Sequence, residues 1–194
     1  MNDSDASLRK RALRSEVRAR RSKRSSHERA LLESGLTTQL STLIETVQPH
    51  SLAGFIPTET EPPIRPGLEA VHHRGCDVLL PISREDRTMD WAVHHPGIEP
   101  IVDALGMPAP GGQPVAPSRA YDVDLVLCPA ALVDRSGHRL GWGLGYYDRF
   151  LTNLTRTPPI VAVVFDDDIV DALPHEPHDV RVSGILTPTR LIWL

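Results

Sequence analysis

The sequence predicts an α/β fold in which helices flank a largely parallel sheet. Short, apolar, β-rich segments recur along the chain and alternate with segments of helical periodicity, which is the pattern of strand–helix–strand units. The chain has 194 residues, of which 40% are hydrophobic, enough for one sizeable core but too few for two full domains. We therefore expect one domain over residues 1–194.

The first predicted helix is strongly basic. Residues 9–29 hold ten of the 21 lysines and arginines against two acids, in a chain of net charge −4. One helical stripe gathers four cations: Lys10, Arg14, Arg18 and Arg21. A second face, which we expect to pack against the rest of the protein, consists of Leu8, Ala12, Ser15 and Ala19. The basic stripe fits a solvated face, an anion clamp or a nucleic-acid arm, and the acidic remainder of the chain disfavours the last.

Helix caps, apolar periodicity and prolines predict the helices, strands and connections that follow the basic helix. Ser25 and Glu28 have the spacing of a capping box, and the apolar stripe of the second helix continues to about residue 48. The proline-rich segments 57–66 and 96–117 predict irregular connections. We expect a short helix at 67–74, a helix from Tyr146, and strands at 51–56, 77–81, 89–94, 124–128, 160–165 and 190–194.

Residues 137–149 are the most informative segment, because three glycines at alternate positions lie between a cation, Arg139, and a carboxylate, Asp148. Glycine tolerates positive φ and lets backbone N–H groups approach an anion, so such a loop at the start of a helix can wrap a phosphate chain. Tight turns without a ligand have a similar composition. The P-loop and dinucleotide-binding patterns are both absent. The segment predicts phosphoryl binding with a metal nearby, or a structural turn.

Three polar segments follow predicted strands: residues 58–61, the glycine loop and residues 166–168. Ligands of parallel α/β sheets gather beyond the carboxyl ends of the strands. Each segment alone is equally typical of a solvated strand end. Together they predict one site.

Other residues limit the class of protein. Cys76 and Cys128 lie beside predicted strands without a metal-binding spacing, so we expect reduced core thiols. We expect no zinc site at the histidine groups His72-His73, His94-His95 and His175-x-x-His178, because sequence neighbours rarely chelate together and prolines interrupt the last group. The longest apolar run, 160–165, is too short to cross a bilayer, and the N-terminus lacks a signal-peptide pattern. We expect a cytoplasmic monomer that binds neither membrane nor nucleic acid.

Three motifs together resemble the 5-formyltetrahydrofolate cyclo-ligase family, also called methenyltetrahydrofolate synthetase. They are Arg-Leu-Gly-Trp-Gly-Leu-Gly-Tyr-Tyr-Asp at 139–148, which is highly specific, Lys-Arg-Ala-Leu-Arg at 10–14, and Leu-Pro-His-Glu-Pro-His-Asp at 173–179. Their order and spacing match over nearly the whole chain. The resemblance implies a three-layer α/β/α domain. It also implies an ATP- and Mg²⁺-dependent closure of 5-formyltetrahydrofolate to 5,10-methenyltetrahydrofolate, with release of ADP and phosphate.

The resemblance further implies roles for individual residues. Phosphoryl transfer needs positioning and charge neutralisation rather than a covalent nucleophile, so the expected catalytic residues are the cations Lys10, Arg14 and Arg139. The implied ATP-binding positions are Lys10, Arg11, Ala12, Leu13, Arg14, Arg139, Leu140, Gly141, Trp142, Gly143, Leu144, Gly145, Tyr146 and Tyr147. The implied folate-binding positions are Ile56, Glu61, Trp142 and Tyr146, and the implied Mg²⁺ ligands are Asp148 and Asp179.

Several of these residues have a second interpretation. The rings of Trp142, Tyr146 and Tyr147 suit a pterin or an adenine, and equally suit core packing. Glu61 suits the amino-pyrimidine edge of a pterin, and equally an exposed loop. The chain departs from the common family pattern in the folate-pocket region at Ala109, Leu144, Asp168, Ser183 and Pro188, with Asp168 standing where Gln is frequent.

Two rival functions remain open at this point. A sugar-phosphate isomerase or CoA-transferase-like enzyme can use a related scaffold, and ATP consumption distinguishes it. An RNA-binding protein would use the basic helix and bind in a strongly salt-dependent manner.

Overall fold

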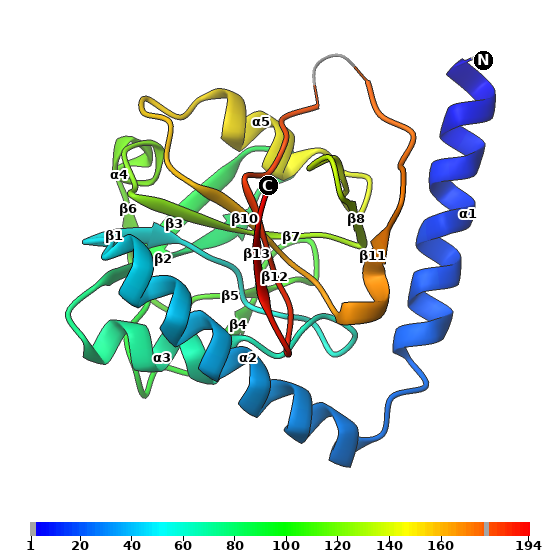
Figure 1. Ribbon diagram of the computed structural model, residues 1–194. Coiled ribbons are helices and arrows are strands. Elements are labelled where there is room, and N and C mark those ends of the chain that lie inside the picture. The colour runs from blue at the N-terminus through cyan, green and yellow to red at the C-terminus, as the bar shows by residue number, and fades with distance from the viewer. Residues whose placement is uncertain (1–2, 177–178) are drawn as a thin grey trace.

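An eight-stranded sheet forms the centre of the protein (Figure 1). The computed structural model describes residues 3–176 and 179–194. The sheet order is β13 (Leu191–Trp193), β12 (Gly184–Leu186), β10 (Ile160–Val163), β7 (Leu125–Pro129), β1 (Ser51–Ala53), β2 (Asp77–Ser83), β3 (Met89–Val93) and β6 (Pro114–Val115). The five strands from β12 to β2 are parallel, and the three outer strands join through antiparallel pairs. The largely parallel sheet predicted from the sequence is confirmed.

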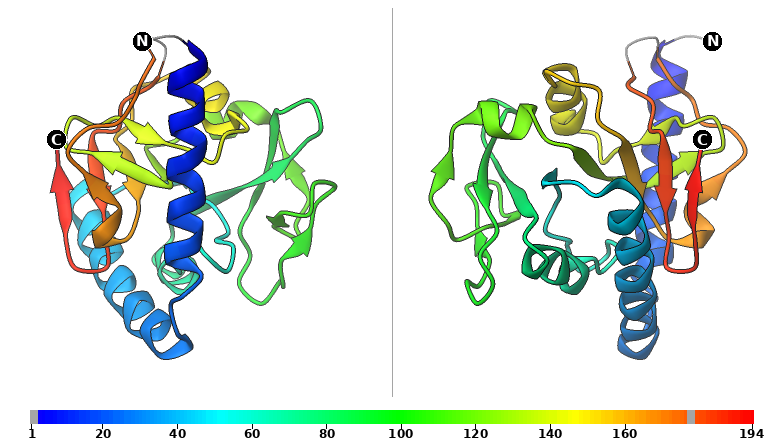
Figure 2. Two further views of the ribbon diagram at one scale, coloured as in Figure 1. Left: turned by 90° about the vertical axis from the view of Figure 1, so that its right-hand side faces the viewer. Right: turned by 60° about the vertical axis from the view of Figure 1, so that its left-hand side comes forward.

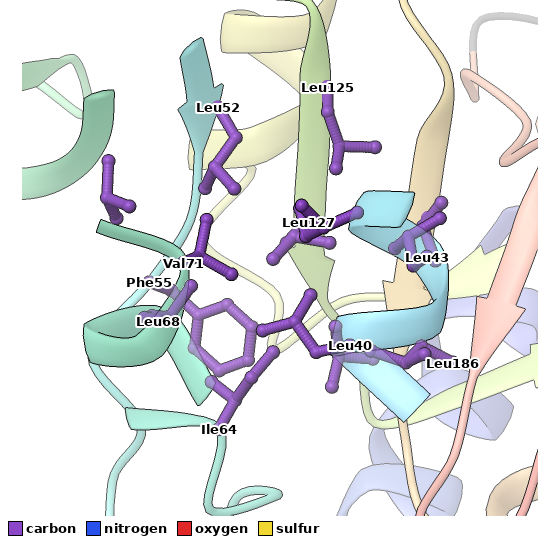
Figure 3. Packing of buried hydrophobic residues seen from close by; sticks show 14 of the residues in the cluster. Leu40, Leu43, Leu52, Phe55, Ile64, Leu68, Val71, Leu125, Leu127 and Leu186 are labelled. Carbon is purple, nitrogen blue, oxygen red and sulfur yellow. The ribbon is translucent and has the colours of Figure 1, made fainter. Parts of the chain in front are cut away.

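Helices cover both faces of this sheet. On one face lie α2 (Ser26–Val47), which begins with the predicted capping box, and α3 (Arg65–His73). Their leucines, such as Leu40 and Leu68, pack against Leu52 and Leu127 of the strands (Figure 3). On the other face lie α4 (Pro117–Tyr121) and α5 (Tyr146–Thr152), where Phe150 belongs to a second buried cluster. Alternate strand residues enter alternate clusters, and the implied three-layer α/β/α arrangement is confirmed.

The first helix, α1 (Asp3–Arg21), stands at one side of the molecule (Figures 1 and 2). It packs against a small sheet made of β11 (Ile169–Val170), β8 (Leu132–Asp134) and β9 (Arg139–Leu140). The apolar part of this contact consists of buried Val17 and half-buried Leu13 on α1, with Leu132, Leu140 and Leu173 on the body.

The packing face predicted for α1 is wrong. Leu8 is 63% exposed, and Ala12, Ser15 and Ala19 are exposed as well. Three cations of the basic stripe instead lie on the side that contacts the body: Lys10, Arg14 and Arg21. The reason is that their partners are carboxylates and backbone carbonyls of the body, so hydrogen bonds and charge, rather than small-residue packing, set the rotation of the helix.

Most predicted strands are present with shifted ends. The strand expected at 51–56 ends at Ala53, the one expected at 77–81 continues to Ser83, and the helix expected at 67–74 begins at Arg65 because Pro66 is favourable in a first helical turn. Prediction missed α4, β8, β9, β11, β12 and a 3₁₀ turn at Asp166–Asp168. The segment 96–117 is also less irregular than predicted, since it contains β6 and a hairpin of β4 (Ile101–Val102) and β5 (Pro108–Ala109).

The two cysteines behave as predicted for core thiols. Cys76 and Cys128 are free and buried, and burial raises the pKa of each thiol to about 11, so both stay protonated at neutral pH. Among the described helices, none is long and apolar enough to span a membrane.

Candidate active site

The candidate site lies where the central parallel strands end. β1 has β2 on one side and β7 on the other, so the chain connections diverge at this point, which is where ligands of such sheets bind. Residues 54–61 follow β1, the β8–β9 hairpin and glycine loop follow β7, and Asp166–Asp168 follow β10. The sequence predicts residues 58–61, the glycine loop and residues 166–168 at this edge, but it does not predict the β8–β9 hairpin that precedes the loop.

A buried carboxylate, Asp134, fixes the hairpin that leads into the glycine loop. Its Oδ1 accepts hydrogen bonds from the backbone N–H groups of Ser136 and His138 at 2.9 and 3.0 Å, and its Oδ2 accepts one from Leu173 at 3.0 Å. These bonds close the turn between β8 and β9 and tie it to the C-terminal segment. The glycine loop therefore starts from a fixed backbone.

The loop itself needs glycine at two of its three glycine positions. Gly143 and Gly145 have φ of 102° and 73°, in the left-handed region that other residues rarely adopt. Gly141 has no positive φ, and a Cβ built there meets no atom within 4 Å. The exposed Leu144 lies between the two strained positions, and Gly145 caps α5.

One of the predicted phosphate contacts, Arg14, reaches this loop from α1. Arg14 Nε donates to the carbonyl oxygen of Gly141 at 2.7 Å, and its Cζ lies 3.3 Å from where a Cβ on Gly143 would stand. Burial and the neighbouring Arg18 lower the pKa of Arg14, while Asp148 opposes this shift. An arginine nevertheless remains charged at neutral pH. The glycine loop thus has a fixed cation against it.

Lys10, one turn before Arg14, approaches the second candidate metal ligand. Its Nζ lies 2.8 Å from Glu176 Oε1 and 3.8 Å from Asp179 Oδ2. The other residues of the implied 10–14 segment differ in placement: Arg11 and Ala12 are exposed, and Leu13 packs in the apolar contact of α1. Lys10 and Arg14 are therefore the members of this segment that the structure brings to the site.

Arg139 is enclosed rather than free. Its side chain is 3% exposed and donates to the carboxylate of Asp148 and to the carbonyl oxygen of Val180. One guanidinium therefore joins β9, the first turn of α5 and the segment before β12. Its charge lies at the glycine loop, neutralised by Asp148.

The two implied metal ligands are both carboxylates and are both paired with cations. Asp148 is 43% exposed and pairs with Arg139, and Asp179 accepts a hydrogen bond from the backbone N–H of Glu176 at 2.8 Å and lies near Lys10. Within residues 3–176 and 179–194, no group of three His, Cys, Asp or Glu side chains is arranged to hold a metal. One or two carboxylates fit Mg²⁺ well when phosphate oxygens and water supply the other ligands.

Glu61 and Trp142, two implied folate positions, contact each other. Trp142 Nε1 donates to Glu61 Oε1 at 2.8 Å, while Thr58 donates to Oε2 through its backbone N–H at 2.9 Å and its hydroxyl at 3.0 Å. Glu61 is buried, so it is not the exposed loop carboxylate of the second interpretation. A carboxylate offers about four lone-pair positions, and three are used. A bidentate ligand would therefore take the open position on Oε1 and displace the Thr58 hydroxyl from Oε2.

The hydroxyl groups of the two tyrosines after the glycine loop both donate hydrogen bonds to backbone carbonyl oxygens. Tyr147 donates to the carbonyl oxygen of Gly54 at 3.0 Å, and burial raises its pKa well above the ordinary value. Tyr146 donates to the carbonyl oxygen of Arg84 at 2.7 Å. Both rings contact the core clusters, so core packing is part of their role.

Ile56, the remaining implied folate position, is half-buried at the wall of a neighbouring pocket. This pocket is mainly apolar and also contains Arg65, His94 and His95. Ala109, one of the departures from the family pattern, is buried in β5, next to Pro110 of the pocket wall. The third histidine group includes His178, which lies outside the described residues.

Prediction missed the role of Arg21. The sequence indicates no role for it beyond membership of the basic stripe, yet it is buried and forms an ion pair with Asp168, whose carboxylate also pairs with Arg20. The available signal was the proximity of Asp168 to the predicted ligand-binding edge. The sequence alone did not connect it with a helix 147 residues away.

Comparisons with known proteins relate the chain to one family. A family model described as the 5-formyltetrahydrofolate cyclo-ligase family matches residues 6–188. A 5-formyltetrahydrofolate cyclo-ligase of Mycolicibacterium smegmatis is 35% identical over 146 residues, which are 73% of this chain and 75% of the relative. That of Escherichia coli K12 is 29% identical over 162 residues, covering 80% and 87%.

Solved structures show the same fold. A 5,10-methenyltetrahydrofolate synthetase of Aquifex aeolicus matches with a TM-score of 0.78 at 27% identity, over 95% of this chain and 92% of that one. A 5,10-methenyltetrahydrofolate synthetase of Mycoplasma pneumoniae matches with a TM-score of 0.73 at 22% identity, over 92% and 98%.

The loop geometry predicts different tolerance at two glycines. Gly143→Ala should lower the free energy of unfolding by about 1–3 kcal/mol, because alanine is strained at positive φ and its methyl group would meet the Arg14 guanidinium. Gly141→Ala should leave it within about 0.5 kcal/mol, since its Cβ enters open space. Urea denaturation of both variants measures the difference, and equal stability would contradict the loop conformation.

Proposed function

The chain is an enzyme of the 5-formyltetrahydrofolate cyclo-ligase family, and we propose that it closes 5-formyltetrahydrofolate to 5,10-methenyltetrahydrofolate with conversion of ATP to ADP and phosphate. The ATP and Mg²⁺ requirements and the residue roles are part of this proposal. The expectations of a cytoplasmic location, a monomer, and no membrane or nucleic-acid partner stay predictions.

One observation carries the proposal most strongly: two α1 cations meet the glycine loop and a carboxylate across more than a hundred residues of sequence. Arg14 is bonded to Gly141, and Lys10 is close to Asp179. A loop with left-handed glycines at the start of a helix presents backbone N–H groups, and the added cations suit a triphosphate. A fixed turn alone would not require cations from a distant helix.

The chemistry proposed for this site has three steps. The formyl oxygen of the substrate attacks the γ-phosphorus of ATP, and the bond from that phosphorus to the bridging oxygen of ADP breaks. N10 of the folate then attacks the formyl carbon, which the phosphoryl group has made electrophilic. Loss of phosphate and of the N10 proton completes the methenyl bridge between N5 and N10.

Charge neutralisation and alignment are what the residues supply. Phosphoryl transfer has little covalent chemistry for a protein to perform, so positioned cations dominate its catalysis. Lys10 and Arg14 would bind the phosphates, and Arg139 holds Asp148 and the loop in register. Asp148 and Asp179 would hold Mg²⁺, which would supply charge that neutralises the phosphates.

Glu61 is proposed to recognise the pterin. An amino-pyrimidine edge presents adjacent N–H donors, which match a carboxylate fixed by Trp142 and Thr58. The buried position of Glu61 strengthens such hydrogen bonds, because water competes less.

The activity is tested by mixing the protein with 5-formyltetrahydrofolate, ATP and Mg²⁺ and following methenyl absorbance and ADP. One ADP should form per methenyl product. The isomerase and transferase alternatives predict no ATP consumption, and absence of methenyl product would refute the proposed function.

Removing either α1 cation should weaken use of ATP. Lys10→Ala and Arg14→Ala should each raise the KM for ATP by about tenfold or more, since a hydrogen bond to a charged group contributes about 1.5–3 kcal/mol. Arg9→Ala, at an exposed neighbour on the same helix, should leave it within about twofold. Steady-state kinetics at saturating folate measures all three. Equal small effects would support a solvated helix instead.

The metal role of Asp148 has its own test. Asp148→Asn should raise the Mg²⁺ concentration at half-maximal rate by about tenfold, because the amide is a weaker ligand for a hard cation. Asp171→Asn is the matched control, at a fully exposed carboxylate near Arg135. Circular dichroism checks the fold of both proteins. An unchanged Mg²⁺ titration in Asp148→Asn would remove this residue from the metal site.

A further inference from the structure

Arg21 is a buried cation whose Nε and Nη2 have fixed partners, whereas its Nη1 is buried without one. It is the last residue of α1 and is 1% exposed. Its Nε and Nη2 donate to Asp168 Oδ2 at 3.1 and 2.7 Å, and Nη2 also donates to the carbonyl oxygens of Ala130 and Ala131 at 2.9 and 3.1 Å. Its position is therefore defined by the loops that follow β10 and β7. The planar guanidinium can satisfy such divergent acceptors at once.

The same guanidinium lies over two aromatic rings. Arg21 Cζ is 5.3 Å from the ring centre of Trp142 and 5.1 Å from that of Phe165. A desolvated cation within this distance is attracted to the face of an aromatic ring. Because Arg21 is fixed by four hydrogen bonds, the attraction holds the indole of Trp142 rather than the reverse.

The indole of Trp142 in turn restricts the position of the Glu61 carboxylate. The indole Nε1 has a single hydrogen to donate, and it goes to Glu61 Oε1 at 2.8 Å. The orientation of the indole therefore helps to fix this carboxylate oxygen, while Thr58 holds the other one. Glu61 is buried, so no water replaces the indole as a partner without a rearrangement.

We propose that Arg21 is a positioning residue for the reduced folate, acting through Trp142 on the carboxylate of Glu61. The inference rests on the proposed function, because Glu61 is taken to recognise the pterin. Arg21 itself touches neither substrate. The anchor, Asp168, stands where the family pattern frequently has Gln, so the charged form of this arrangement belongs to this chain.

A neighbouring arginine supplies a matched control. Arg24 lies three residues after Arg21, forms an ion pair with Asp167 at 2.6 Å, and packs over the same Phe165 ring with its Cζ 3.8 Å from the centre. The cations over Trp142 are Arg18 and Arg21. Arg24 therefore resembles Arg21 in charge, pairing and aromatic contact, but lacks the link to Glu61.

The test compares Arg21→Lys with Arg24→Lys. Lysine keeps the charge but lacks the planar fork, so it cannot hold Asp168 and both carbonyls while lying flat over the indole. Arg21→Lys should raise the KM for 5-formyltetrahydrofolate about tenfold and leave the KM for ATP within about twofold. Arg24→Lys should change neither. A purely structural Arg21 would lower kcat through loss of folded protein, or raise both KM values together, and either result would overturn the proposal.

Trp142→Phe gives a second test that does not depend on the folding of Arg21→Lys. It keeps a flat ring over Arg21 but removes the donor to Glu61, so it should reproduce the folate-selective rise in KM. In the double variant the two effects should not add, because both act on the same carboxylate. An unchanged folate KM in Trp142→Phe, or full additivity, would overturn the inference. If the wild-type protein forms methenyl product and Arg21→Lys behaves like Arg24→Lys, only the inference fails; if the wild type is inactive, the proposed function fails.

Discussion

The attachment of α1 to the body is the constraint on which the candidate site depends. The helix carries Lys10 and Arg14, yet its apolar contact with the body is limited to residues such as Val17 and Leu13. Ion pairs and hydrogen bonds make the rest of the contact, from Lys10 at one end to Arg21 at the other. Buried ion pairs contribute little net free energy of folding, because removing both charges from water is costly. Each pair nevertheless forms in only one geometry. Ion pairs and hydrogen bonds therefore fix the orientation of α1 more than the burial of apolar surface does.

The sequence predicted most strands of the sheet and the position of three polar segments after them, because these follow from local patterns. The runs at 124–128 and 160–165 are continuous and apolar, and the glycine spacing before Tyr146 marks a helix start. Strands of two or three residues, such as β8 and β9, are too short to show a period. For this reason the sequence did not predict the small sheet of β11, β8 and β9.

The packing face of α1 was predicted wrongly for a different reason. Periodicity finds the stripes of a helix, but it does not say which stripe is buried when the partners are carboxylates. Those of Lys10 and Arg21 lie 166 and 147 residues further along the chain. The same limit applies to Glu61 and Trp142, which were identified separately and are hydrogen-bonded to each other. Residue type indicated the chemistry, and only the fold supplies the pairings.

The order in which the chain is synthesised gives these long separations a further meaning. α1 leaves the ribosome before its acidic partners, because Asp168, Glu176 and Asp179 follow β1 to β10 along the chain. Domains form as units once enough of the chain is available. The central sheet can begin to assemble while the basic helix still has no acidic surface on which to dock. The candidate site is thus completed only after these acidic residues have emerged, and until then the basic helix of the nascent protein lacks the carboxylates that neutralise it.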